Sequence, residues 1–175
     1  MKIPLKAGLI IAVTIFIVNI IQIDLVGIEY KFIRENSDVF PALVLAIGLF
    51  VGMRMVRKIS YENQITFGQT LFGGLLITLF VAVFLTILNM FYFGVLNTGY
   101  AERLIKVYTP LYIEMKLTPE IIAIQTKGMR DTYTVIGQLK ETFIVIGLIG
   151  VVLSTVFSSI LRTKDSFTEV LKKGE

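Results

Sequence analysis

Residues 64–101 read QITFGQTLFGGLLITLFVAVFLTILNMFYFGVLNTGYA and contain no charged side chain. Crossing about 30 Å of hydrocarbon takes about 20 helical residues, so this stretch can supply a membrane-spanning helix together with a polar approach and exit. The composition agrees, because 55% of the 175 residues are hydrophobic and only 17% are charged, whereas charged residues make up about 25% of ordinary soluble domains. The stretch therefore predicts a membrane protein.

Other uncharged windows flank this stretch, at residues 7–23, 39–53 and 142–161. Because helix ends reach into the headgroups, the windows predict four transmembrane helices, at about residues 7–27, 39–57, 67–96 and 142–162. The chain is then one all-α integral membrane domain, residues 1–175, with a long helical extramembrane connection at about residues 98–141 between the third and fourth spans.

Within that connection, Thr118-Pro119-Glu120 predicts the start of a helix. It combines a capping hydroxyl, a proline at the first helical position and an acid at the positive end of the helix dipole. Apolar residues then recur every seven positions, at Ile122, Met129, Ile136 and Phe143. This period predicts one helix running unbroken from Pro119 into the fourth span, while Pro110 is expected to interrupt any helix before it. The connection is either a hairpin, packed on itself or lying on the bilayer, or a docking arm for a partner protein.

Gly68 and Gly73 have the G-x-x-x-x-G spacing that opens a phosphate-binding loop. Such a loop requires Lys and Ser or Thr after the second glycine and a strand before the first, and here Gly74 and an apolar run follow. The nucleotide interpretation therefore fails, and the glycines instead predict close helix packing, within one chain or between two. The predicted packing glycines are Gly48, Gly52, Gly68, Gly73, Gly74, Gly147 and Gly150.

Amide side chains are the most informative polar residues of the predicted spans. They are Asn19 and Gln22 in the first helix and Asn89 in the third. Amides in lipid seek partners, and a hydrogen bond between helices is worth about 1 kcal/mol, so we expect them to join helices. The alternative is that the three line a polar path through a small oligomeric transporter or channel.

The sequence contains no cysteine and no histidine. This removes thiol nucleophiles, imidazole bases and zinc sites of the Cys/His type. The acids nearest an interface, Asp24, Glu29, Glu35 and Asp38, match no metal-ligand spacing. We therefore expect no catalytic residues, metal or cofactor, and a non-enzymatic structural or accessory role. The expected surroundings are membrane lipids and a second copy or a membrane-protein partner, without nucleic acid.

Basic residues predict the orientation, because Lys and Arg favour the cytoplasmic side of short connections. They cluster at the predicted N-terminal end, second connection and tail, as Lys2, Lys6, Arg54, Arg57, Lys58, Arg162, Lys164, Lys172 and Lys173. The long third connection carries six further basic residues, but the rule weakens with loop length. Both termini are therefore expected in the cytoplasm.

The chain also resembles a family of small bacterial membrane proteins, classed as domain of unknown function 4199. The resemblance rests on ITFGQTLFGGLLITLFVAV at residues 65–83, preceded by the basic MRMVRK and matched by RTKD after the last span. Thr70 departs from it, because a small alanine is commoner there. The resemblance implies a four-helix protein of the bacterial inner membrane with no catalytic residues.

Overall fold

The computed structural model describes residues 2–27 and 36–163, and every regular element within these ranges is helical. Four helices are long and apolar enough to cross a membrane. Their bounds are α1 (Lys2–Ile20) with the π-helical η1 (Ile21–Gly27), α3 (Val39–Ser60), α4 (Phe67–Phe91) with the π-helical η2 (Tyr92–Leu96), and α7 (Val135–Leu161). The predicted all-α fold with four apolar spans is confirmed. The fourth helix begins at Val135, before the predicted start at about residue 142.

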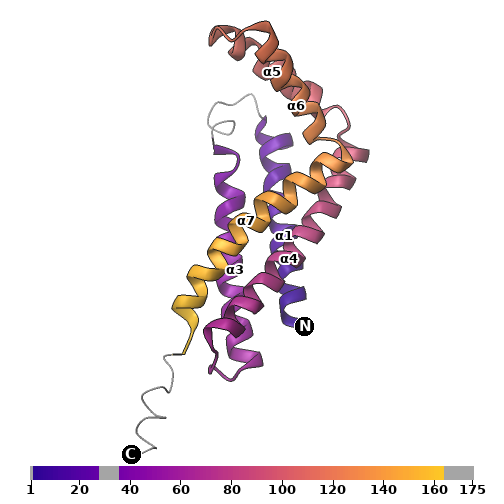
Figure 1. Ribbon diagram of the computed structural model, residues 1–175. Helices are drawn as coiled ribbons and strands as arrows, with labels where there is room; N and C mark the ends of the chain where they lie inside the picture. The colour runs from indigo at the N-terminus through magenta and orange to yellow at the C-terminus, as the bar shows by residue number, and fades with distance from the viewer. Residues whose placement is uncertain (1, 28–35, 164–175) are drawn as a thin grey trace, which may run out of the picture.

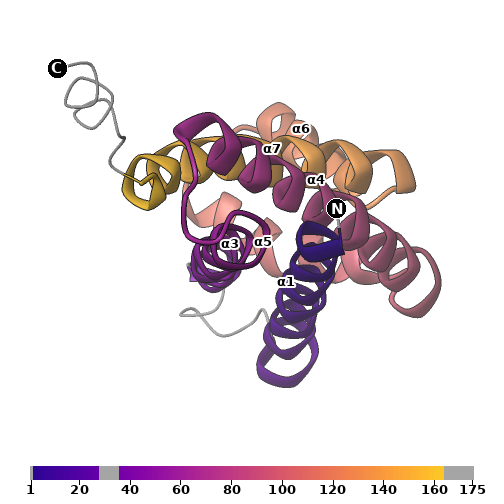
Figure 2. The same cartoon turned by 90° about the horizontal axis from the view of Figure 1, so that it is seen from below.

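α4 is the central helix of the bundle, with α1 on one side of it and α7 on the other (Figure 2). Of its apolar window 44% is buried, against 28% in each of the other three. Ile77, Val81 and Leu85 recur every four residues along α4 and form its buried stripe. They meet core residues of the other helices, which include Ile11, Ile15, Leu45, Leu49, Met53 and Ile146. The outward faces are apolar as well, as expected for lipid contact.

The start of α4 is fixed by a capping box. The Gln69 N–H donates to the Thr66 hydroxyl (3.3 Å), and the Thr66 N–H donates to the Gln69 side-chain oxygen (3.0 Å). Both bonds satisfy donors that the first helical turn would leave without a partner. The predicted entry of the third helix at Phe67 is therefore confirmed, and the glycines behind it lie inside a helix.

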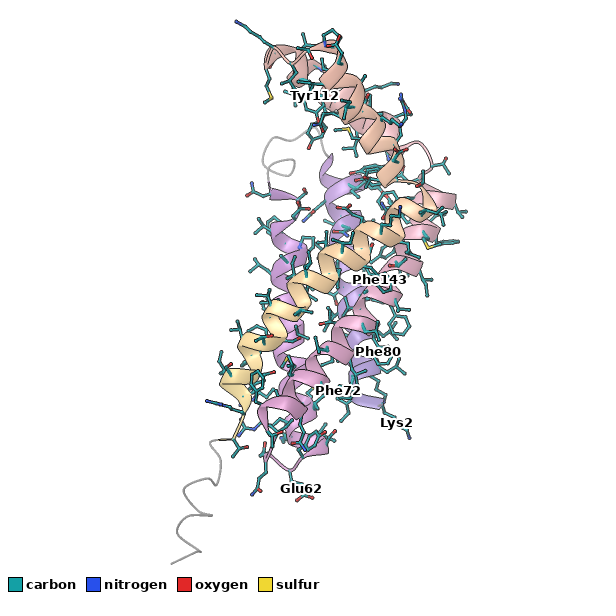
Figure 3. The ribbon with its side chains drawn as sticks, in the orientation of Figure 1. Lys2, Glu62, Phe72, Phe80, Tyr112 and Phe143 are labelled. Atoms are coloured by element: carbon teal, nitrogen blue, oxygen red, sulfur yellow. The ribbon has the colours of Figure 1, made fainter. Side chains whose placement is uncertain are left out.

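The end of α7 is tied to the chain just before α4. The Thr163 N–H donates to the Ile65 carbonyl, and the Ile65 N–H donates to the Thr163 hydroxyl, each at 3.0 Å. Lys2 and Glu62 lie at this same end of the bundle, and Tyr112 lies at the other (Figure 3). We call these the terminal end and the hairpin end.

Glycines let the helices approach closely, but not at every predicted position. A Cβ atom built at Gly48, Gly52, Gly73, Gly74 or Gly150 meets a side chain of another helix within 3.3 Å: Ile11, Ile77, Val56, Ser154 and Thr78, respectively. At Gly68 and Gly147 it meets nothing within 4 Å among the described residues. Close packing within the chain therefore does not hold for these two, because they lie on faces turned away from the neighbouring helices. The sequence analysis missed Gly8, whose added Cβ would lie 2.5 Å from Phe80 Cβ.

The connection between α4 and α7 forms a hairpin of two helices, α5 (Tyr100–Glu114) and α6 (Pro119–Thr132). It projects beyond the bundle at the end opposite the N-terminus (Figure 1). The predicted start of α6 is confirmed, since the Thr118 hydroxyl accepts from the Ile121 N–H and Pro119 occupies the first turn. Lys116 turns the chain between the helices with a positive φ of 56°.

Pro110 does not interrupt α5, which continues through it to Glu114. A proline in a helix removes one backbone hydrogen bond and crowds the preceding turn. Here Pro110 is exposed, so water can satisfy the freed carbonyl. The neighbouring Thr109 hydroxyl also donates to the Ile105 carbonyl (2.7 Å) and adds a bond beside the proline. The prediction of an interruption was wrong for this reason.

α6 and α7 are separate helices, so the prediction of one unbroken helix was also wrong. The helical conformation is interrupted at Tyr133 and Thr134. The Thr134 hydroxyl caps α7 by accepting a hydrogen bond from the Gly137 N–H (3.0 Å). Because of this interruption, the apolar residues that recur every seven positions do not lie on one continuous helix face. Met129 is half-buried before it, whereas Ile136 after it is 66% exposed.

The two hairpin helices are linked by an exposed ion pair, in which the Arg130 Nε donates to Glu102 Oε1 at 2.7 Å and Nη2 donates to Oε2 at 3.3 Å. The hydrogen bond from Arg130 holds the pKa of Glu102 below its ordinary value of 4.5. A lowered carboxylate pKa contributes stability above the unfolded-state pKa, and this stability is lost as the pH falls through the folded-state pKa.

We therefore expect acid to loosen the hairpin before it loosens the bundle. Hydrogen exchange of α6 amides, corrected for the intrinsic pH effect, should rise severalfold relative to α4 as the pH falls below 4.5. Glu102→Gln should show the faster exchange already at neutral pH, and Glu114→Gln should behave as the wild type. An α6 that keeps its protection at pH 3 would contradict the role of this pair.

Candidate functional site

A cavity of about 310 Å³ lies at the hairpin end of the bundle. The end of α1 with η1, the start of α3, the later part of α4 with η2, and the start of α7 surround it, and the base of the hairpin borders it. Its polar lining residues are Asn19, Gln22, Ser37, Asp38, Asn89, Tyr100, Thr132, Tyr133, Gln138, Glu141 and Thr142. Apolar residues complete the wall, among them Ile15, Leu85 and Ile146. The three amides predicted from the sequence therefore line one cavity.

The amides do not hold the helices together in the way we predicted. Within the described ranges, no side-chain hydrogen bond joins Asn19, Gln22 or Asn89 to another helix, although Gln22 is only 7% exposed and Asn89 only 9%. The Gln22 Nε2 is buried and has no hydrogen-bond partner there. An unsatisfied buried donor costs about 1–3 kcal/mol. The amides border the cavity, and the packing of apolar side chains joins the helices.

Gln138 is a further buried amide of the cavity wall. Its Nε2 donates to the Thr132 carbonyl (2.9 Å), so it links the start of α7 to the last turn of α6. Gly137 beside it allows this approach, because an added Cβ would overlap the Asp131 carbonyl oxygen. We call this contact between the end of α6 and the start of α7 the joint. It sets the direction of the hairpin relative to the bundle.

A hydrogen-bonded network lies next to the cavity where η1 and η2 meet. The Tyr92 hydroxyl donates to Asp24, the Asn97 amide donates to the Tyr92 hydroxyl (2.8 Å), and Arg103 donates to Asn97 (2.6 Å). Arg103 Nη2 also lies 3.9 Å from Asp24 Oδ1. Short π-helical segments are frequent at functional sites, and here Asp24 of η1 meets Tyr92 of η2. The network connects α1, α4 and the base of α5.

Aromatic rings cover the hairpin side of the cavity. The ring centres of Tyr100 and Phe93 each lie 4.8 Å from that of Tyr133. Burial raises the pKa of Tyr133 to about 12, and the carboxylates of Glu141 and Asp38 act in the same direction. Burial also raises the pKa of Tyr100. Both phenols are therefore neutral at physiological pH and pack as an amphipathic lid over the cavity.

The interfacial acids considered in the sequence do not act as one group. Asp24 belongs to the network with Tyr92, whereas Asp38 borders the cavity. Glu29 and Glu35 lie outside the described residues. Within the described ranges, no three acidic side chains gather into a geometry for a metal ion.

One protein family matches almost the whole chain. Residues 6–163 match DUF4199, described as a protein of unknown function. The chain belongs to this family. The matched range includes α3, α4 and α7 whole, α1 from residue 6 onward, the hairpin and the cavity. No curated protein and no solved structure matches this DUF4199 chain.

The part of the site that follows the hairpin was not predicted from the sequence of this DUF4199 chain. Tyr133, Gln138 and Thr142 line the cavity, but their positions fell within or beside the predicted continuous helix. The Thr134-x-x-Gly137 spacing was the available signal, because a capping hydroxyl predicts a helix start. Without the break at that point, Gln138 had no reason to be placed near the amides of α1 and α4.

Proposed function

We propose that this chain is a non-enzymatic accessory protein that uses the α5–α6 hairpin to hold a second membrane protein. The observation that carries this proposal is the apolar free end of the hairpin. Ile113 is 62% exposed and Met115 67% at the tip, and Ile124 in the second turn of α6 is 68% exposed. Exposed apolar groups that gather at one end of an element are typical of interaction sites.

A protein fits this end of the hairpin better than the bilayer does. The hairpin projects past the bundle (Figure 1), so its free end points away from the hydrocarbon that the four apolar helices occupy. Charges of both signs surround the apolar residues, with Glu114 and Glu120 beside Lys116 and Lys127. An anionic lipid surface would favour a basic face, whereas a mixed rim around an apolar centre is typical of protein interfaces.

The hairpin is also held in place for such a role. Arg130 and Glu102 link its two helices, and the Tyr100–Tyr133 ring contact anchors its base. A pre-ordered surface loses less conformational entropy on binding. We place the protein in the bacterial cytoplasmic membrane as a multi-pass protein with both termini in the cytoplasm. The basic Arg54, Arg57 and Lys58 near the terminal end support this orientation.

The experiment is purification of the tagged full-length chain in mild detergent. We expect one membrane protein to copurify in a fixed ratio with the wild type and with Lys106→Ala, and the combined Ile113→Asp and Ile124→Asp variant to lose it at least tenfold. An aspartate at such a contact leaves a charge to be desolvated on binding. Retention by the aspartate variant, self-association without a partner, or recovery of lipid alone would each reject the proposal. Normal thermal unfolding of the variant in detergent shows that the fold is intact.

The alternative of a small oligomeric transporter or channel has one observation in its favour, since Asn19, Gln22 and Asn89 line the same cavity. Toward the terminal end, however, Ile11, Ile77 and Val81 are at most 4% exposed and packed together. A polar path through one chain would have to cross this core. The accessory role therefore fits the geometry better.

A further inference from the structure

We propose that the cavity at the hairpin end binds the polar end of an uncharged amphipathic molecule, with a ligand oxygen accepting a hydrogen bond from Gln22 Nε2. This site is separate from the apolar end of the hairpin and does not depend on the docking role. A volume of about 310 Å³ lies at the lower end of the range of small-molecule sites. It suits a small amphiphile or one end of a lipid.

Gln22 supplies the specific polar contact. Gln22 lines the cavity and is only 7% exposed, and its Nε2 is closed off in the wall without a partner among the described residues. Rotation of the amide toward the cavity would present Nε2 to a ligand. Buried polar groups in folded proteins are nearly always hydrogen-bonded. A carbonyl, ester or hydroxyl oxygen of a ligand would provide the acceptor that the protein does not.

The wall of the cavity selects an amphiphile. Ile15, Leu85 and Ile146 belong to the apolar part of the wall and are each at most 8% exposed. Asn19 and Thr142 bring further hydrogen-bonding groups to the same space. Apolar walls with a few placed polar groups are typical of sites for small organic molecules.

The charges exclude an anionic head. Among the lining residues in the described part of the chain, Asp38 and Glu141 are acidic and none is basic. Both carboxylates also lie close enough to Tyr133 to raise the pKa of its hydroxyl. A carboxylate or phosphate ligand would meet like charges without a cation to balance them, whereas an uncharged head would not.

The test uses 1-decanoylglycerol as the uncharged probe and decanoate as its anionic counterpart. Both are titrated against the full-length chain by native mass spectrometry from detergent. The wild type should bind one 1-decanoylglycerol saturably and decanoate at least tenfold more weakly. Gln22→Leu should weaken the glyceride at least tenfold, and the matched Gln125→Leu, at an exposed position of α6, should not.

Thermal unfolding separates ligand binding from a structural role of Gln22. Because its amide nitrogen has no partner within the described ranges, Gln22→Leu should unfold at the same or a higher temperature than the wild type without ligand. A lower unfolding temperature, undiminished glyceride binding, or no binding by the wild type would overturn the proposal. Solvent extraction of the purified protein identifies the source of the natural ligand. A neutral lipid that copurifies with the wild type and is missing from Gln22→Leu indicates a ligand from the membrane. Glyceride binding without such a lipid indicates a free amphiphile.

Discussion

Gly150→Ala is expected to lower the free energy of unfolding by about 1–3 kcal/mol, the usual cost of overpacking a filled core. Gly150 lies where α7 packs against α4, and an added Cβ would overlap Thr78 Cγ2. Thr78 is only 5% exposed, so it has little room to move. The higher helix propensity of alanine offsets at most about 1 kcal/mol of this loss.

Gly147→Ala is the matched control, since it lies in the same helix and its added Cβ meets nothing within 4 Å in residues 2–27 and 36–163. It should unfold like the wild type or slightly later in a denaturing-detergent titration. Adding Thr78→Ala to Gly150→Ala should recover part of the loss, because it removes the atoms nearest the new methyl group. It also removes a buried hydroxyl that has no partner in the described part of the chain. Equal stability of the two single variants would contradict the observed packing of α4 and α7.

Gly137→Ala is expected to disrupt the joint between α6 and α7. Its Cβ would overlap the Asp131 carbonyl oxygen and lie 2.6 Å from that of Thr132, and these backbone atoms cannot rotate away as a side chain can. We expect a loss of about 1–3 kcal/mol, as for other overpacked sites. The bond from Gln138 to the Thr132 carbonyl should break, which would displace one wall of the cavity.

The control for this joint is Gly128→Ala in α6, where the added Cβ meets no atom of the described residues within 4 Å. It should be neutral or stabilising by up to about 1 kcal/mol. Thermal unfolding and hydrogen exchange around Gln138 report the two effects. If Gly137→Ala leaves the exchange of residues 132–138 unchanged, the close contact at the joint is not part of the native structure.

Helix starts that depend only on neighbouring residues were predicted well from the sequence. The polar approach and the uncharged stretch behind it placed the start of the third helix at about residue 67, and Thr118-Pro119 placed the start of α6. The same kind of signal at Thr134 was overlooked because the seven-residue stripe favoured one long helix. Local capping was the better guide there, since Ile122 and Met129 are half-buried before the break, whereas Ile136 and Phe143 after it are exposed.

Contacts between helices were predicted less well. Glycine spacing identified Gly48 and Gly150 correctly as positions of close approach, but it included Gly147 and missed Gly8. Residues three apart on a helix lie on neighbouring parts of its surface. Whether Gly147 or Gly150 meets another helix depends on how α7 is rotated about its axis when its side chains interdigitate with those of its neighbours.

The sequence by itself determined that this is an all-α membrane protein with four apolar spans and a helical connection, because the preference of a segment for lipid depends mainly on its own side chains. Only the tertiary structure decided that Asn19, Gln22 and Asn89 share a cavity with Gln138, and that the hairpin stands apart from the bundle. The physical reason is that these features depend on the relative rotation and breaks of several helices. Those are set by contacts between residues far apart in the chain, which no single segment encodes.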